Sequence, residues 1–159
     1  MSTADVTPPA AASGAAGPVD PQAVVVSFLT AIQDGELEYA ASLLAEDAQW
    51  INVSLPTLRG RARIAWLSQL LMGRLGVGFR VHLHAVASDG NVVLTERDDA
   101  LVYGRVEQRF WVWGRFEVED GLITVWRDSF DWRDYIVGFL RGVAGAVVPR
   151  LNRPWPGRR

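Results

Sequence analysis

Two periodicities divide the chain into a helical first half and a stranded second half. Apolar residues recur every three or four positions up to residue 74, which predicts amphipathic helices. The first helix is well marked, because Asp20 and Pro21 form a helix start and Asp34-Gly35 a stop. The predicted helices cover about 21–34, 37–44 and 61–74, with a strand over 48–54.

From residue 77 onward the apolar period falls from 3.6 to 2, which indicates β-strands. Strands are predicted over 77–87, 90–103, 105–118 and 122–130, followed by a helix from about Asp131. Turn signals separate them at Asp89-Gly90, Gly104 and Asp120-Gly121, and these signals suit tight antiparallel hairpins.

Helices followed by a meander of strands predict an α+β domain. We expect a curved, mixed but mainly antiparallel sheet that wraps around the N-terminal helices and leaves a cone-shaped pocket. The expected organisation is a disordered tail over 1–20, a single domain over 21–148 and an irregular basic tail over 149–159.

One predicted strand, LTERDDALV at 94–102, carries four consecutive charges. Because side chains alternate between the faces of a strand, Arg97 and Asp99 share one face, while Glu96 and Asp98 share the other. On the last strand Asp128 stands in an apolar, aromatic row.

An unpaired carboxylate is costly in such a row, and pairing with an arginine relieves the cost. Arg97 between Asp99 and Asp128 would form an acid–base unit whose two carboxylates share one proton. The alternative from spacing alone is a salt-bridge network on a solvated sheet face.

Composition removes several classes of chemistry. The 159 residues carry a net charge of −2, so nothing points to a nucleic-acid partner. The absence of cysteine excludes disulfides and thiolate sites and is compatible with a cytoplasmic location. All 16 basic residues are arginine, so no catalytic lysine exists. His82 and His84 are too few ligands for a metal site, and no apolar run is long enough for membrane insertion.

Three segments carry a resemblance to a known family. WINV, ERDDALV and FWVWGRFEVEDGLITVWRDSFD together resemble the limonene-1,2-epoxide hydrolases over about residues 22–148. The likeness is strongest to the mycobacterial-type branch, which acts on bulkier lipid and sterol-like epoxides. It implies the cone-shaped α+β fold shared with ketosteroid isomerase and nuclear transport factor two.

The resemblance also implies catalytic roles. Asp128 corresponds to the base that activates water, Asp99 to the acid that protonates the epoxide oxygen, and Arg97 to the bridge between them. Asn52 corresponds to a residue that holds the water. Trp50 stands where the family has a second water-holding residue, a tyrosine; an indole only donates a hydrogen bond, whereas a phenol also accepts one.

These residues together predict an epoxide hydrolase that makes a vicinal diol by one-step acid–base catalysis, without cofactor or metal. The expected substrate is a hydrophobic terpene-, lipid- or sterol-like epoxide. The expected pocket wall comprises Leu101, Val112, Trp126, Phe130 and Phe139.

Two other functions stay open at this point. One is an epoxide-opening cyclase in which a substrate hydroxyl replaces water, and the other is a lipid- or sterol-binding protein without turnover. The strand at 105–118 is apolar on both faces, with Trp111 and Trp113 on one of them, which predicts a homodimer through the outer sheet face.

Overall fold

The computed structural model describes residues 19–152 and residue 155; of the tail predicted over 1–20, residues 1–18 lie outside them. The helices are α1 (Pro21–Asp34), α2 (Leu37–Ser42), α3 (Arg61–Ser68), its π-helical continuation η1 (Gln69–Arg74), α4 (Trp132–Val147) and the 3-10 turn η2 (Pro149–Leu151). The strands are β1 (Leu44–Asn52), β2 (Leu58–Arg59), β3 (Gly78–Asp89), β4 (Val92–Tyr103), β5 (Val106–Glu119) and β6 (Leu122–Ser129).

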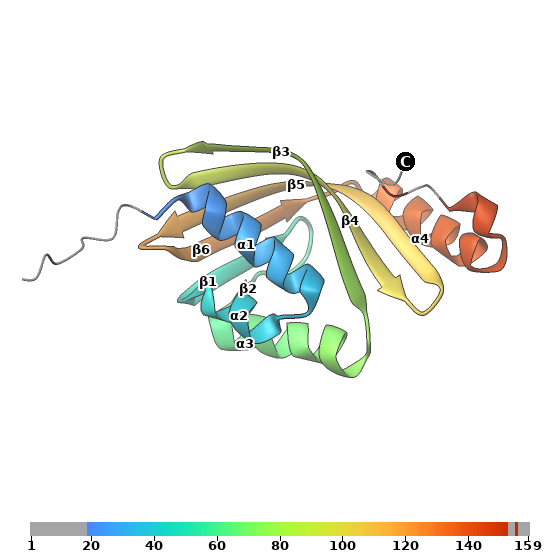
Figure 1. The fold of residues 1–159 in the computed structure, drawn as a ribbon, viewed down its shortest axis with the longest axis horizontal. Helices are drawn as coiled ribbons and strands as arrows, with labels where there is room; N and C mark the ends of the chain where they lie inside the picture. Colours follow the sequence, from blue (N-terminus) through green and yellow to red (C-terminus); the bar gives the residue numbers. More distant parts are fainter. Residues whose placement is uncertain (1–18, 153–154, 156–159) are drawn as a thin grey trace, which may run out of the picture.

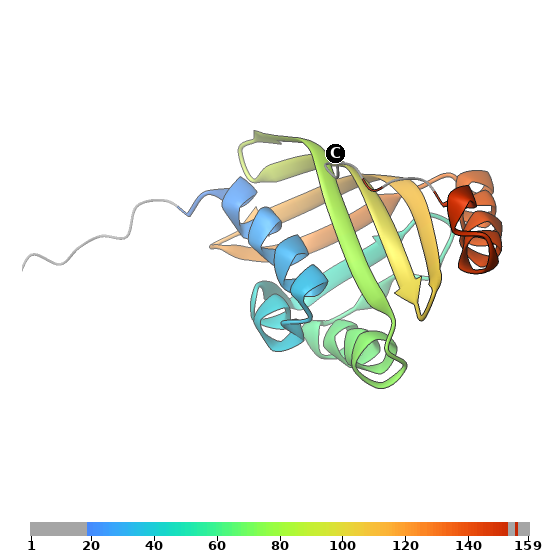
Figure 2. The same ribbon diagram turned by 45° about the vertical axis from the view of Figure 1, so that its right-hand side comes forward.

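The strands form one curved sheet in the order β2-β1-β6-β5-β4-β3 (Figure 1). All neighbouring pairs are antiparallel except β1 and β6, which run parallel. Helices α1, α2 and α3 cover the concave face, and α4 lies apart from them at the far end of the sheet (Figures 1 and 2). The predicted fold class, an α+β cone with a mixed sheet, is confirmed.

Local signals place the elements as predicted at several points. The Asp20 side chain accepts a hydrogen bond of 3.0 Å from the backbone N–H of Gln22, and Gly35 ends α1 with a φ of 76°. Two-residue turns join β3 to β4, β4 to β5 and β5 to β6. Their positive-φ residues are Gly90, Gly104, Asp120 and Gly121.

The structure differs in detail from the predicted elements at three points. Strand β1 begins at Leu44, which we assigned to the preceding helix; its side chain is buried in either conformation, so periodicity cannot separate the two. The helix predicted over 61–74 has these bounds, but its last part, Gln69–Arg74, is π-helical. On β6, strict alternation from Asp128 predicts that Thr124 is on the buried face, but a register shift reverses the alternation and Ile123 is buried instead.

The core fills the space between α1 and the concave sheet face. Phe28 of α1 lies edge-on to Phe116 and Trp126, with ring centroids 6.4 and 5.0 Å apart respectively. The core does not fill the whole cone, and the remaining space lies between the sheet and η1. Among the described residues no helix is both long and apolar enough to cross a membrane.

Helix α4 covers the part of β5 that extends beyond its pairing with β6. Asp134 accepts a hydrogen bond of 3.1 Å from the backbone N–H of Trp111. Gly138 and Gly142 allow the helix to approach closely, since a Cβ there would lie 2.3 Å and 2.4 Å from carbonyl oxygens of β5. The helix therefore protects an otherwise open strand edge.

Candidate active site

A cavity of about 470 Å³ opens between the concave sheet face, η1 and the start of α4. Its wall is predominantly apolar. Four of the five side chains predicted to line it do so: Leu101, Val112, Trp126 and Phe130. The fifth, Phe139, does not line it and is 48% exposed, because the turn of α4 before it presents Trp132 and Tyr135 to the cavity instead.

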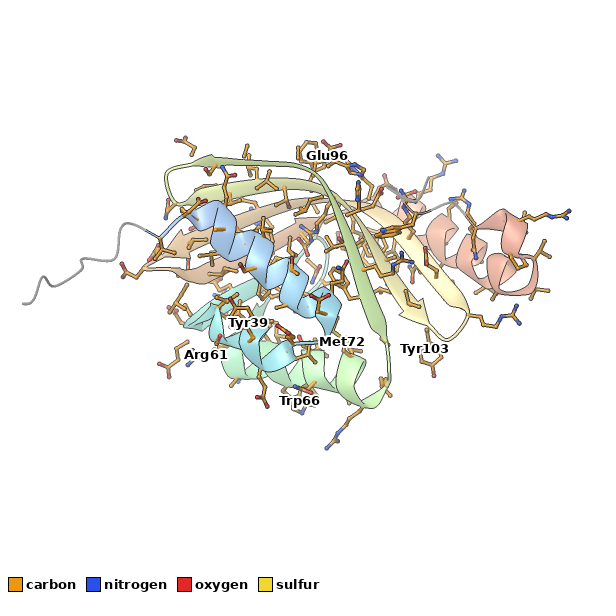
Figure 3. The ribbon with its side chains drawn as sticks, viewed as in Figure 1. Tyr39, Arg61, Trp66, Met72, Glu96 and Tyr103 are labelled. Atoms are coloured by element: carbon orange, nitrogen blue, oxygen red, sulfur yellow. The ribbon has the colours of Figure 1, made fainter. Side chains whose placement is uncertain are left out.

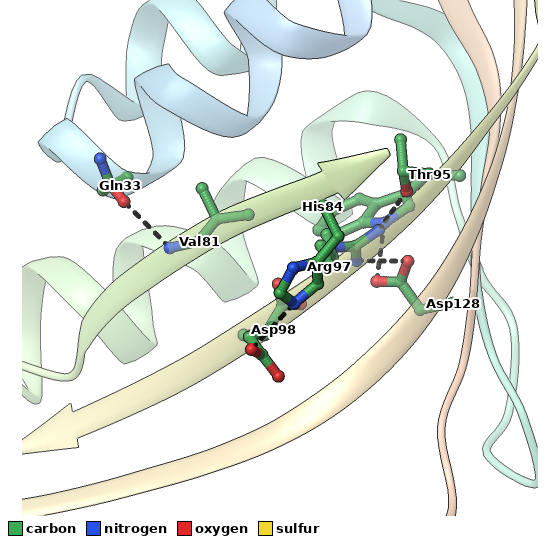
Figure 4. A network of polar contacts seen from close by, with 9 residues as sticks. Gln33, Val81, His84, Thr95, Arg97, Asp98 and Asp128 are labelled. Atoms are coloured by element: carbon green, nitrogen blue, oxygen red, sulfur yellow. Dashed lines mark hydrogen bonds and ion pairs between the residues drawn. The ribbon is translucent and has the colours of Figure 1, made fainter. Parts of the chain in front are cut away.

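The charged residues predicted to come together meet at the floor of this cavity. Arg97 donates from Nε to both carboxylate oxygens of Asp99, at 2.9 and 3.2 Å, and from an Nη to Oδ1 of Asp128, at 2.6 Å. Arg97 is fully buried, and the two aspartates are 4% and 6% exposed. Figure 4 shows the contacts of Arg97, and the low exposure of all three side chains makes this an internal network and not a solvated surface network.

Strand register explains this meeting. Arg97 and Asp99 alternate onto the concave face of β4, and β5 separates β4 from β6, which carries Asp128. The long Arg97 side chain crosses β5 at Gly114, the residue paired with Asp128. Trp126, two residues before Asp128 on the same strand, donates its indole N–H to Oδ2 of Asp128 at 2.8 Å.

Burial and charge act on the three groups in opposite directions. Burial raises the pKa of Asp99 to about 6, against the lowering effect of the Arg97 charge. Burial also raises the pKa of Asp128, opposed by Arg97 and by the Trp126 hydrogen bond. Burial would lower the pKa of Arg97, but Asp128 and Asp99 raise it above its ordinary value. The unit holds one permanent cation and two carboxylates that compete for a proton.

The raised pKa of Asp99 predicts a pH dependence of stability. A carboxyl that binds its proton more tightly in the folded state stabilises the fold below pH 3.8, and this contribution is lost as the pH rises through about 6. The free energy of unfolding of the wild type should therefore fall between pH 4 and 6 relative to that of Asp99→Asn, by at most about 1.4 kcal/mol per pH unit. Urea unfolding at a series of pH values measures this difference, and parallel curves for the two proteins would contradict it.

Thr95 and Gly114 shape the channel for the Arg97 side chain. Thr95 accepts a hydrogen bond of 3.0 Å from the second Nη of Arg97. A Cβ on Gly114 would lie 2.1 Å from that nitrogen and 2.4 Å from Oγ1 of Thr95. Because both neighbours are fully buried, neither has room to move aside.

We expect Gly114→Ala to displace Arg97 and to lower activity together with stability. Overpacking of a buried site costs about 1–3 kcal/mol, and the ion pair to Asp128 would lengthen. Thermal unfolding and the rate of turnover test this, with Gly90→Ala as a control at an open turn glycine. The control should lose stability through its positive φ of 56° and keep its turnover rate. Equal rates for Gly114→Ala and the wild type would contradict the expectation.

Asn52 and Trp50 lie on β1, next to the strand that carries Asp128. In the parallel pairing of β1 with β6, Asn52 is opposite Asp128 and Trp50 is opposite Trp126, and all four line the cavity. The Trp50 and Trp126 rings stack with centroids 4.5 Å apart. Nε1 of Trp50 is buried and makes no hydrogen bond to any described residue.

The opposite face of β4 carries a separate polar cluster. Asp98 accepts hydrogen bonds from Arg109 at 2.5 Å and from His84 at 3.0 Å, while Glu96 points outward (Figures 3 and 4). Trp155, from the tail predicted to be irregular, lies on this face with its ring centroid 4.3 Å from the guanidinium of Arg80. The division of the charged strand into an inner and an outer pair is therefore as predicted.

Sequence reasoning did not single out several residues at the site. Thr95, Gly114 and the indole N–H of Trp126 support the charges, and Trp132 and Tyr135 line the cavity. The sequence contains a signal for Trp132 and Tyr135, because positions three apart share one helix face. It contains no signal for Gly114, because the role of this residue depends on the path of a side chain from another strand.

Comparison with known proteins agrees with this geometry. A family model described as the limonene-1,2-epoxide hydrolase catalytic domain matches residues 19–141. The epoxide hydrolase EphG of Mycobacterium tuberculosis is 45% identical over 128 residues, which are 80% of this chain and 85% of that protein.

Solved structures show the same relationship. An epoxide hydrolase of M. tuberculosis, described as similar to limonene-1,2-epoxide hydrolase, superposes with a TM-score of 0.80 at 42% identity, covering 85% of this chain and 95% of that one. A protein of Kribbella flavida described as a putative ketosteroid isomerase shares the fold alone, with a TM-score of 0.59 at 19% identity over 87% of this chain and 84% of that one. With a family match over most of its length and a relative at 45% identity, the chain belongs to the limonene-1,2-epoxide hydrolase family.

Proposed function

We propose that this protein hydrolyses an apolar epoxide to a vicinal diol, using water as the nucleophile and no cofactor. The observation that carries the proposal is the position of Arg97, ion-paired with both Asp99 and Asp128 at the floor of an apolar cavity. Epoxide opening needs a proton donor for the leaving oxygen and a base for the attacking water, and this unit supplies both.

Hydrogen bonding supports one assignment of the two roles. Asp128 accepts from Arg97 at 2.6 Å and from Trp126 at 2.8 Å, and both bonds favour its ionised form. Within the described part of the chain Asp99 accepts from Arg97 alone, so the shared proton is best held there. Asp128 is thus the base and Asp99 the acid.

The reaction then proceeds in one step. Water gives a proton to Asp128 as its oxygen bonds to an epoxide carbon, while the opposite C–O bond breaks and its oxygen takes the proton of Asp99. The diol leaves Asp128 protonated and Asp99 ionised. A net proton transfer from Asp128 to Asp99 restores the starting state, and Arg97 balances the single negative charge throughout.

Asn52 is the second group that we propose to hold the water, because it lies opposite Asp128 and lines the cavity. The Trp50 ring stacks on Trp126, which donates to Asp128, and this stack is the contribution that we assign to Trp50. Trp50 would therefore act on the base through Trp126.

Variants at Trp50 test this division of labour. Trp50→Phe keeps an aromatic ring for the stack and loses only the indole N–H, so kcat should change by less than about threefold. Trp50→Ala removes the stack and should lower kcat by about tenfold or more, because small displacements of a catalytic group are costly. Steady-state rates for both variants decide the point, and a large loss in Trp50→Phe would assign the N–H a direct role.

The cavity indicates the class of substrate. Its volume of about 470 Å³ is in the ~300–1,000 Å³ range of sites for drug-sized ligands, and its wall is mainly leucine and aromatic side chains. Apart from the catalytic cluster and Asn52, the wall offers few polar groups that could orient a polar substrate. Terpene-, lipid- or sterol-like epoxides fit these properties.

Product analysis tests the proposed function. The purified protein would be incubated with limonene oxide, epoxystearate and a sterol epoxide, and the products identified by mass spectrometry. A vicinal diol from at least one of them is expected. A cyclic ether from a hydroxy-epoxide would instead identify a cyclase, and tight binding without any product would identify a binding protein.

We also propose that the protein forms a homodimer through the outer sheet face. Trp111 and Trp113 lie on that face, 37% and 49% exposed, with their rings 5.1 Å apart. Exposed neighbouring tryptophans are common at protein interfaces. Sedimentation velocity of the wild type and of Trp113→Gln would test the dimer.

We propose a cytoplasmic location, because the absence of cysteine from the sequence suits a reducing compartment.

A further inference from the structure

Helix α4 carries an exposed apolar stripe along its outer face. Its closely packed face consists of the glycines that touch β5, so the opposite face points away from the sheet. Positions 136, 140, 143 and 147 follow helical spacing and lie on one face. The side chains there are Ile136, 54% exposed, Leu140, 61%, Val143, 43%, and Val147, 80%.

The stripe continues to the cavity. Trp132, in the first turn of α4, lines the cavity and is still 38% exposed, and Tyr135 lines it as well. Leu55 and Leu71 belong to the cavity wall and are 49% and 36% exposed. Exposed apolar side chains therefore lie both on the cavity wall and along α4, and Trp132 belongs to both sets.

Charge is distributed unevenly along the chain. Residues 132–159 contain six arginines and one aspartate, a formal charge of +5, whereas the total of −2 leaves −7 for residues 1–131. Arg133 and Arg150 of this C-terminal segment are exposed near the two ends of α4. A cationic segment next to an apolar helix face is complementary to an anionic, apolar surface.

We propose that α4 docks on the surface of an anionic lipid bilayer, with its apolar stripe among the acyl chains and its arginines at the headgroups. Surface contact of this kind needs an amphipathic helix and not a membrane-spanning one. The wall of the cavity would then border the phase in which an apolar epoxide dissolves; this last consequence rests on the proposed function, and the docking itself does not.

The docking is measured without substrate, by sedimenting the full chain with sucrose-loaded vesicles. Vesicles of phosphatidylcholine alone are compared with vesicles that also contain phosphatidylglycerol. The wild type should bind the anionic vesicles with a partition coefficient at least about tenfold higher than the neutral ones, less so at high salt. Arg133→Gln/Arg150→Gln should reduce this preference by about tenfold.

The apolar stripe is tested by Ile136→Gln/Leu140→Gln, which should lower binding to anionic vesicles by at least about tenfold. Trp66→Gln is the matched control, because Trp66 is 65% exposed on α3, away from α4 (Figure 3). Asp128→Asn should bind as the wild type does, so loss of catalysis and loss of docking are separable.

Three results would overturn the proposal. The first is a wild type that binds neither kind of vesicle, and the second is binding that Ile136→Gln/Leu140→Gln leaves unchanged. The third is a wild-type oligomer that this double variant converts to monomers while vesicle binding is absent, which would make the stripe an interface between copies of the chain.

Discussion

Replacing Asp128 with asparagine is expected to lower kcat/KM for epoxide hydrolysis by about 10³–10⁴-fold. Asparagine keeps the size of the side chain, and its single amide oxygen can still accept from Arg97, while its NH2 group takes the place of the oxygen that accepts from Trp126, so the fold should persist. It cannot take a proton from water, and the nucleophile is then no longer activated. Initial rates measured on protein with a native near-UV circular dichroism spectrum would record the loss.

Asp98→Asn provides the matched control, because Asp98 is on the same sheet but on its outer face. Its partners Arg109 and His84 lie on the outer face, and it does not line the cavity. Its activity should stay within about twofold of the wild type. An Asp128→Asn protein that keeps more than a tenth of the wild-type rate would remove Asp128 from the role of base.

Replacing Arg97 with methionine should destabilise the protein by about 3–5 kcal/mol and abolish turnover. The change leaves two carboxylates that are 4% and 6% exposed without a cation, and an uncompensated buried charge is among the most costly defects of a fold. Domains of this size are typically stable by only about 5–15 kcal/mol, so much of the margin would be lost.

The loss of stability in Arg97→Met should depend on pH. Without Arg97 the pKa of both carboxyls rises further, so protonation at lower pH removes the buried charge and stability is lost as pH increases. Chemical denaturation should show Arg97→Met recovering between pH 7.5 and 5, and Arg97→Met/Asp128→Asn should exceed the single variant in stability at pH 7.5. Arg115→Met, which breaks a half-exposed pair with Glu117, should cost at most about 1 kcal/mol. If Arg97→Met and Arg115→Met lowered the free energy of unfolding by similar amounts, the buried ion pairs would contribute no more to stability than a partly exposed pair.

The parts of the fold that were predictable depend on local chemistry. Asp20, Pro21 and Gly35 act within one turn of α1, and Asp-Gly or glycine turns act within single hairpins, so both are visible in sequence. The split of the charged strand into two faces was predictable because alternation in an uninterrupted strand is strict.

The parts that were not predictable depend on contacts between distant segments. The register shift in β6 that buries Ile123 is a property of the pairing of β6 with β5, and no neighbouring residue in the sequence predicts it. The sequence predicts only that Gly114 belongs to a strand, whereas in the structure its missing Cβ makes room for Arg97. Phe139 fits a helical stripe, but the direction of that stripe depends on which face of α4 the glycines place against β5.

Single-turnover hydrolysis in oxygen-18 water tests the central claim most directly. Enzyme in molar excess over the epoxide would convert it once, and mass spectrometry would locate the label. Direct attack by water held at Asp128 predicts a diol that carries one labelled oxygen from the first turnover and an enzyme that carries none. An unlabelled diol with oxygen-18 in the carboxylate of Asp99 or Asp128 would show that an aspartate attacks the epoxide, and the acid–base account of the site would then be wrong.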